Sequence, residues 1–98
     1  MAMTPEKAVK AKVVKQLKEL GAYYFFPATG GYGRSGVPDI IVCYHGIFFA
    51  IECKAGKNTT TPLQEKELLA INRAGGFTVV VNEQNLHCIT EWLEGIGE

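Results

Sequence analysis

No stretch of this 98-residue chain contains the roughly 20 consecutive uncharged apolar residues that a membrane-spanning helix needs. The N-terminal region also lacks the apolar core of a secretory signal, because lysines recur in it at short intervals. Both absences argue against a membrane protein. We therefore expect an intracellular protein of the cytoplasm, or of the host cytoplasm if its source is viral.

Cysteine and histidine are also scarce. The three cysteines, Cys43, Cys53 and Cys88, are an odd number, and no two of them form a Cys-x-x-Cys pair. The two histidines lack the spacing from cysteine that zinc ligands usually have. These patterns disfavour a disulfide-stabilised fold and a zinc site, and they predict reduced thiols that are largely buried.

The chain has no excess of positive charge, since ten lysines and arginines balance ten acidic residues. Affinity for nucleic acid phosphates comes mainly from lysine and arginine, so this balance alone argues against a nucleic acid partner. The charges are unevenly distributed, however. Residues 1–57 carry eight basic and four acidic side chains, whereas residues 58–98 carry two basic and six acidic ones. This asymmetry predicts a polarised surface, although a solvated lysine-rich helix would give the same count.

The sequence does contain a regular succession of helix and strand patterns. Thr4-Pro5 predicts the start of an amphipathic helix that Gly21 ends. The other expected elements are strands at 22–26, 37–44, 47–54 and 77–81, the last buried on both faces, and helices at 62–73 and 83–93. The helix between the last two strands favours their parallel pairing. The order α-β-β-β-α-β-α thus predicts an α/β fold, a small mixed sheet flanked by helices, as one domain over residues 1–98.

A predicted hairpin brings two acids together. Only His45-Gly46 separates the second and third strands, and a two-residue turn is the commonest hairpin connection. In the register that this turn sets, Asp39 lies directly opposite Glu52, with Cβ atoms roughly 5 Å apart, where like charges repel. A divalent cation such as Mg²⁺ would offset the repulsion. Lys54 shares the face of Glu52, because side chains alternate along a strand.

The order of these residues resembles the PD-(D/E)xK nuclease signature, here Pro38-Asp39, twelve further residues and Glu52-Cys53-Lys54. The flanking residues extend the resemblance. They are Gly36-Val37 before the first acid, a threonine-rich stretch, and Pro62-Leu63-Gln64 at a helix start. Over roughly residues 4–82 the chain is similar to the virus-type replication-repair nuclease (VRR-NUC) family. This resemblance implies a restriction-endonuclease-like core.

The resemblance also implies a metal-dependent endonuclease that hydrolyses DNA with Mg²⁺ or Mn²⁺. The metal ligands that it implies are Asp39, Glu52 and the backbone carbonyl of Cys53, with Glu6 directly or through water. The full set of expected catalytic residues is Glu6, Asp39, Glu52, Lys54 and Gln64.

Three of these residues have alternative explanations. Glu6 shares the apolar face of the first helix, which suits a buried site, but an acid is also favoured in any first helical turn. Lys54 could pair with a carboxylate, orient water or stabilise charge on a phosphate, and it could equally be a surface lysine at a strand end. Gln64 faces inward, but Thr61-Pro62-Leu63-Gln64 also fits a capping box.

Candidate contacts to nucleic acid lie in the glycine-rich segment before Pro38 and on the first helix. Tyr32 can stack on a base. The other candidates are Gly33, Arg34, Ser35, Gly36, Lys10, Lys12 and Lys15.

We expect an endonuclease selective for branched or structured DNA, similar to junction resolvases, that acts in replication, repair or recombination. A homodimer is expected because so small a chain offers one active site, whereas cutting both strands requires two. The alternative is a noncatalytic nucleic-acid-binding module that retains the nuclease fold, although binding alone requires no opposed acids. A structural protein with a calcium-stabilised hairpin is a third alternative.

Overall fold

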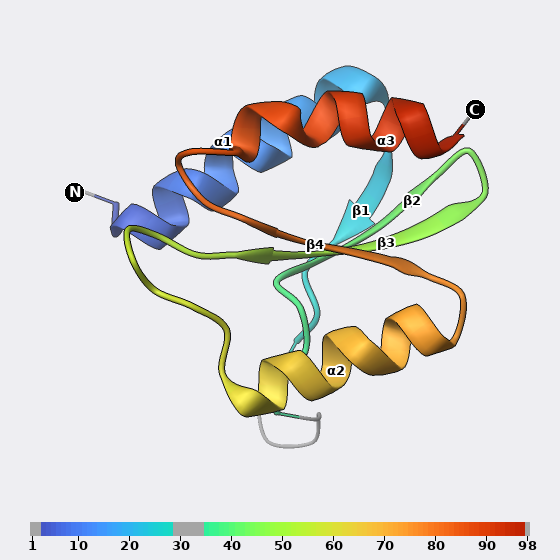
Figure 1. Ribbon diagram of the computed structural model, residues 1–98. Helices are drawn as coiled ribbons and strands as arrows, with labels where there is room; N and C mark the ends of the chain where they lie inside the picture. The colour runs from blue at the N-terminus through green and yellow to red at the C-terminus, as the bar shows by residue number, and fades with distance from the viewer. Residues whose placement is uncertain (1–2, 29–34, 98) are drawn as a thin grey trace.

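A four-stranded mixed sheet forms the middle layer of the protein (Figure 1). The computed structural model describes residues 3–28 and 35–97, and its strands are β1 (Tyr23–Phe25), β2 (Ile40–Tyr44), β3 (Ile47–Cys53) and β4 (Phe77–Val81). They lie in the order β1-β2-β3-β4; β2 is antiparallel to β1 and β3, and β4 is parallel to β3. The parallel pair confirms the predicted crossover.

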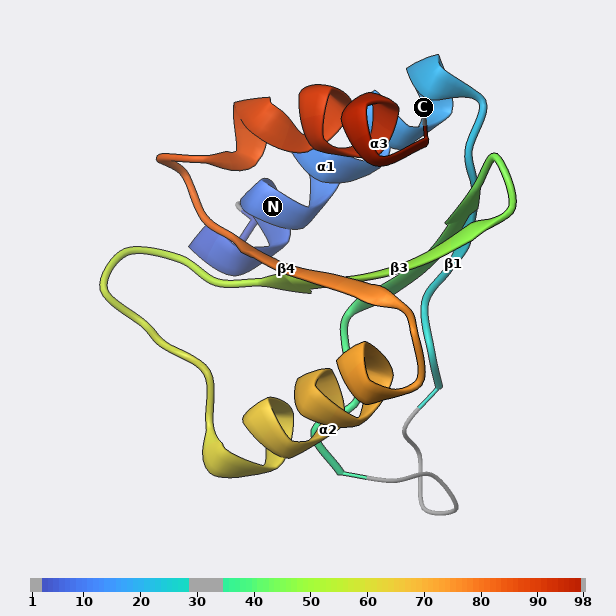
Figure 2. The ribbon, with the colours of Figure 1, turned by 45° about the vertical axis from the view of Figure 1, so that its right-hand side comes forward.

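Helices cover the two faces of the sheet unequally (Figures 1 and 2). The helices α1 (Pro5–Leu20) and α3 (Ile89–Gly97) lie on one face, and α2 (Pro62–Arg73) lies on the other. A short 3-10 helix, Leu86–Cys88, precedes α3. The predicted order α-β-β-β-α-β-α is therefore confirmed. Within the described ranges, none of the helices combines the length and apolarity needed to cross a membrane.

Local signals fix both ends of α1. The Thr4 hydroxyl accepts a hydrogen bond from the backbone N–H of Lys7 at 3.2 Å, and Pro5 occupies the first helical turn. Gly21 ends the helix in the left-handed conformation, with φ 73°. Between these ends the residues at helical spacing are almost completely buried, namely Val9, Val13 and Leu17.

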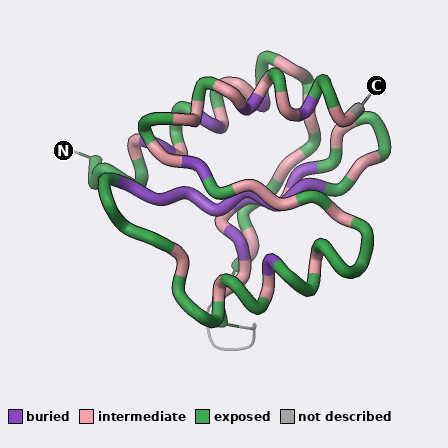
Figure 3. The backbone as a smooth tube through the Cα atoms, in the orientation of Figure 1, coloured by how far each residue is buried: buried purple, intermediate pink, exposed green. Residues whose placement is uncertain are grey.

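The hydrophobic core lies between the sheet and the two helices α1 and α3 (Figure 3). Its other members are Ile40, Val42, Phe49, Ile51, Cys53, Val81, Ile89 and Leu93. The opposite face is covered more thinly, because Leu68 is the only buried apolar residue that α2 contributes among the described residues. Phe48, which lies beneath that helix, is 45% exposed. Polar side chains therefore have room between the sheet and α2.

The hairpin adopts the predicted register. His45 and Gly46 have φ values of 51° and 79°, as a type I′ turn requires at both central positions. The paired Cα positions run from Tyr44 opposite Ile47 to Ile40 opposite Ile51. Asp39 comes immediately before β2, so the register continues to Glu52.

Two predicted features are wrong in detail. β4 is not buried on both faces, since Phe77 is 41% and Val80 is 39% exposed. This strand pairs with β3 alone and forms one edge of the sheet. The last helix begins later than residue 83, because the Asn82 side chain accepts hydrogen bonds from the backbone N–H groups of Gln84 and Asn85 and stabilises a turn there.

Gly36 offers a test of how the segment before Asp39 is held. Its φ is 79°, and an added Cβ would lie 2.6 Å from the carbonyl carbon of Leu63, at the start of α2. Gly46 has the same φ of 79°, but an added Cβ there meets nothing within 4 Å. Both alanine substitutions should cost about 1–2 kcal/mol of backbone strain, and Gly36→Ala should cost a further 1–3 kcal/mol or so from overpacking.

Urea unfolding of the two variants measures this difference. Equal losses in free energy of unfolding for Gly36→Ala and Gly46→Ala would contradict the close contact between Gly36 and the start of α2.

Candidate active site

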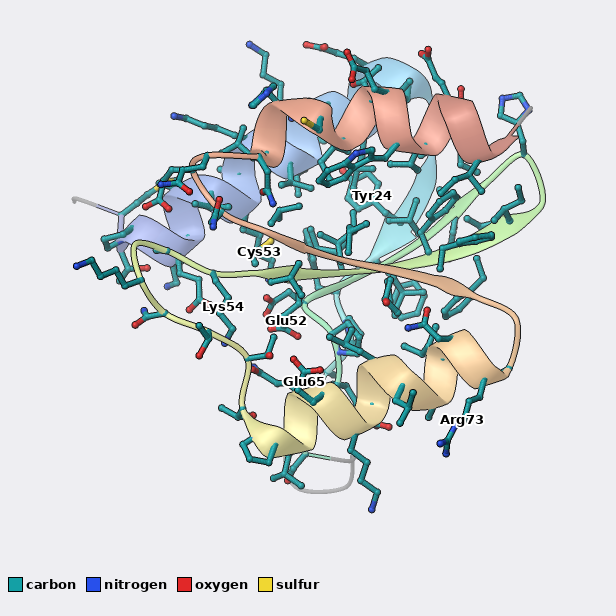
Figure 4. All side chains as sticks on the ribbon, viewed as in Figure 1. Tyr24, Glu52, Cys53, Lys54, Glu65 and Arg73 are labelled. Carbon is teal, nitrogen blue, oxygen red and sulfur yellow. The ribbon has the colours of Figure 1, made fainter. Side chains whose placement is uncertain are left out.

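The two predicted acids meet at the end of the hairpin. Glu52 belongs to β3 and is 2% exposed, and its side chain points into the space between the sheet and α2 (Figure 4). Asp39 is held beside it, because its Oδ2 accepts a hydrogen bond from the backbone N–H of Cys53 at 2.7 Å. One hairpin therefore supplies both carboxylates, as the register predicts.

The surroundings of Glu52 disfavour its charged form. Burial raises its pKa from 4.5 to about 8, and both a hydrogen bond and charge repulsion from Asp39 add to the rise, while the Lys54 ammonium opposes it. Its Oε2 is buried and has no hydrogen-bond partner among the described residues. A buried, unpaired carboxylate oxygen beside a second acid is a position that a bound cation would stabilise.

Lys54 brings a positive charge to this pair. Its backbone N–H donates to the carbonyl of Val81 at 2.8 Å, which continues the pairing of β3 and β4 beyond the end of the strand. Its Nζ lies 4.0 Å from Oε1 of Glu6. Lys54 is only 9% exposed, so it is not an ordinary surface lysine.

Glu6 joins the site through this ion pair. The prediction that Glu6 lies inward with the apolar face of α1 is wrong, because its side chain is 49% exposed. It stands in the first turn of the helix, where it reaches Lys54. In the described part of the chain, no three His, Cys, Asp or Glu side chains are grouped so that they could hold a metal ion.

Gln64 forms the predicted capping box and also contacts Glu52. Its Oε1 accepts a hydrogen bond from the backbone N–H of Thr61 at 2.9 Å, and the Thr61 hydroxyl accepts one from the N–H of Gln64 at 3.2 Å, which completes a capping box. Its Nε2 donates to Oε1 of Glu52 at 3.2 Å. The two ends of one amide thus connect the start of α2 to the acids.

The backbone and the side chain of Cys53 lie in different environments. Its N–H orients Asp39, whereas its thiol lies in the hydrophobic core on the other face of the sheet. Burial raises the pKa of this thiol to about 12, and the charges of Asp39 and Glu52 contribute to the rise. The thiol therefore stays protonated. The role of the Cys53 carbonyl as a ligand remains a prediction.

The predicted nucleic acid contacts are separated by the structure. Tyr32, Gly33 and Arg34 lie outside the described residues. Ser35 is exposed, and Gly36 packs on the start of α2. Lys10 and Lys15 line one groove, and Lys12 is not part of the lining.

Sequence reasoning missed three further residues of this groove, Lys7, Lys18 and Phe26. The sequence could have indicated the two lysines. Lys7 and Lys18 are eleven residues apart, so they lie on the same side of the helix, three turns from each other. It also missed Glu83, whose carboxylate accepts hydrogen bonds from the N–H of Gly56 at 3.0 and 3.1 Å and so holds the segment after Lys54. No sequence pattern indicates that contact.

A second depression adjoins the acids on the α2 side of the sheet. It is an apolar groove of about 890 Å³ that begins at Pro38, next to Asp39, and continues past Ile41 and Phe48 to Ile71 and Phe77. Few polar groups line it, so the site has an apolar wall on this side.

The raised pKa of Glu52 predicts how stability depends on pH. Between pH 4.5 and about 8, folded Glu52 holds a proton that the unfolded chain releases. Because the folded state binds more protons, the free energy of unfolding should fall as pH rises through this window, by on the order of a few kcal/mol without divalent metal. Glu52→Gln should remove this dependence. Urea unfolding at several pH values in EDTA compares the two proteins, and parallel pH profiles would contradict the assignment.

Comparisons with known proteins find a relative and a solved structure of similar fold. No family model matches the sequence. The chain is 30% identical over 92 residues to “Putative nuclease p44” of Acyrthosiphon pisum secondary endosymbiont phage 1, an alignment that covers 91% of this chain and 95% of that protein. Its fold is similar to a solved structure described as a “VRR_NUC domain”, with a TM-score of 0.74, 22% identity, and coverage of 91% of this chain and 97% of that one. The chain belongs to the virus-type replication-repair nuclease family.

Proposed function

We propose that the protein is a nuclease that hydrolyses DNA phosphodiester bonds with Mg²⁺ or Mn²⁺ bound at Asp39 and Glu52. The observation that carries this proposal is the buried Glu52 carboxylate, which lies beside a second acid and keeps one oxygen without a hydrogen-bond partner among the described residues. A like-charged pair in this environment is costly unless a cation binds it. The similarity to a named nuclease supports the same reading.

The residues present fit a hard divalent cation, because such ions prefer carboxylate oxygens. Asp39 and Glu52 would hold it, and the carbonyl of Cys53 is the further ligand that the family resemblance implies. When bound, the metal would polarise the phosphate and lower the pKa of a water molecule.

A backbone N–H and a side-chain amide orient the two acids. The Cys53 N–H engages Oδ2 of Asp39, and the Gln64 amide engages Oε1 of Glu52. Each contact fixes one oxygen of a carboxylate and thereby the direction of the other. Preorganised groups of this kind cost no reorganisation when charge develops in a reaction.

Lys54 supplies the positive charge for the reacting phosphate. Its ammonium is held near the acids by Glu6 at 4.0 Å and is largely shielded from water. A cation placed where negative charge grows stabilises the transition state of phosphoryl transfer. Glu6 acts as a positioning residue for Lys54.

The proposal extends to the substrate and the assembly. Each copy presents one pair of acids, so cleavage of both strands of a branched DNA requires two copies, and a homodimer follows. The noncatalytic alternative explains neither the burial of Glu52 beside Asp39 nor the contact of Gln64 with Glu52. Light scattering of the purified protein measures the assembly.

A cleavage assay tests the function. Labelled linear, flapped and four-way DNA should be cut in Mg²⁺ or Mn²⁺ and not in EDTA, with branched substrates cut faster. Glu52→Gln should lower the rate on the order of 10²-fold or more, because metal affinity depends on oriented ligands. Glu91→Gln, an exposed acid on α3, is the matched control and should cleave normally. DNA binding without cleavage in either metal would favour the noncatalytic module.

Gln64→Glu separates catalysis from helix capping. Glutamate can still accept the hydrogen bond of the Thr61 N–H, so the capping box survives. The new carboxylate replaces a donor to Glu52 with a third negative charge, which should suppress cleavage while the protein remains folded. Gln84→Glu makes the same change at an exposed position on the turn before α3 and should have little effect. Parental cleavage rates in folded Gln64→Glu would leave Gln64 a capping role only.

A further inference from the structure

A second candidate binding surface lies on α1, away from the α2 side of the sheet. A shallow groove of about 530 Å³ runs along this helix, and we name it the lysine groove. Its lining residues are Lys7, Lys10, Ala11, Val14, Lys15, Lys18 and Phe26. The described lining thus contains four positive charges and no acid, on a protein whose formal net charge is zero.

The lysines form a continuous strip. Lys7 and Lys18 are eleven residues apart, which corresponds to three helical turns and about 16 Å along the axis. Duplex DNA carries one phosphate charge per roughly 1.7 Å of its axis, so a strip of this length faces several phosphates. The acids of α1 lie elsewhere: Glu6 pairs with Lys54, and Glu19 is absent from the lining.

Lys10 and Phe26 place one end of the lysine groove near Asp39. The Lys10 ammonium lies 4.3 Å from the centre of the Phe26 ring, an arrangement that fixes the charge by a cation–π contact. Phe25 pairs with Ile41 in the antiparallel register of β1 and β2. Phe26, the next residue, therefore lies beside Ile40, which directly follows Asp39.

Lys12 shows that not every lysine of α1 belongs to this surface. It is exposed, but its charge acts on Glu83, whose carboxylate binds the N–H of Gly56. The pKa of Glu83 is lowered by backbone hydrogen bonds and, to a smaller extent, by Lys12. The charge of Lys12 is thus offset by a nearby acid, whereas no acid belongs to the lining of the lysine groove.

We infer that the lysine groove binds the phosphate backbone of duplex DNA next to the cleavage site. This rests on the proposed nuclease function, because it assigns the groove to the same substrate. The four lysines complement a polyanion. An anionic membrane is a poorer match, since a membrane-bound helix inserts its apolar face and that of α1 is buried against the sheet through Val9, Val13 and Leu17.

The test is salt-dependent binding in EDTA, where cleavage cannot occur. The probe is a 20-base-pair duplex, and the affinity is measured between 50 and 200 mM salt for the parent, Lys18→Gln, Lys7→Gln/Lys18→Gln, and Lys12→Gln as the control on the same helix. The slope of log affinity against log salt should become shallower by about 0.9 for each groove lysine removed and change little for Lys12→Gln. At saturating DNA in Mg²⁺ the groove variants should cleave at nearly the parental rate.

The outcomes separate this inference from the nuclease proposal. Equal slopes for the groove variants and Lys12→Gln would overturn the groove assignment even if the protein cleaves DNA. Groove-dependent binding without cleavage in any metal would support the groove and refute the nuclease. Binding of phosphatidylserine vesicles through the same lysines, with no salt-sensitive binding of the duplex, would overturn the inference in favour of a membrane surface.

Discussion

Two acids, Asp39 and Glu52, are forced together where water would screen their negative charges poorly. A buried carboxylate costs several kcal/mol unless it is paired or hydrogen-bonded. The surroundings reduce this cost in part: a backbone N–H binds Asp39, an amide binds Glu52, and the ammonium of Lys54 lies close by. They do not remove it, because Oε2 of Glu52 has no partner among the described residues and its pKa stays high. Binding of the proposed cation would therefore be coupled to stability at this site.

The two faces of the sheet have different roles: one stabilises the fold and the other carries the acids. The α1 and α3 face buries a dense apolar core, whereas the α2 face keeps an apolar groove and partly exposed aromatic rings. A costly polar cluster is tolerated on the second face because the first supplies the stability that holds the hairpin in register. Cys53 and Glu52 mark this division, since neighbouring residues of β3 point to opposite faces (Figure 4).

The parts that sequence predicted correctly depend on short-range geometry. A two-residue turn sets the hairpin register, so the meeting of Asp39 with Glu52 follows from His45 and Gly46 alone. The capping box at Gln64 is equally local. Its sequence pattern left capping and a role at the acids as alternatives, and in the structure the two ends of the amide contact Thr61 and Glu52.

The parts that sequence could not give depend on where elements lie relative to one another. Helical periodicity placed Glu6 on the apolar face, but the first turn of α1 is not buried with the rest of that face, so its side chain is half exposed. The apolar run of β4 did not reveal that this strand is at the edge of the sheet. The lysine spacing on α1 was visible, but the position of Phe26 beside Lys10 required the fold.

Both helices that reach the site begin in the same way, and this has an electrostatic consequence. Thr4-Pro5 and Thr61-Pro62 cap α1 and α2, and the site residues Glu6 and Gln64 follow within the first turn. A threonine cap fixes where the helix starts, so it also fixes where a first-turn side chain projects. The N-terminus of a helix carries a partial positive charge that favours anions nearby. Gln64, in the first turn of α2, contacts Glu52, so the partial positive charge at the start of α2 favours a negative charge on Glu52.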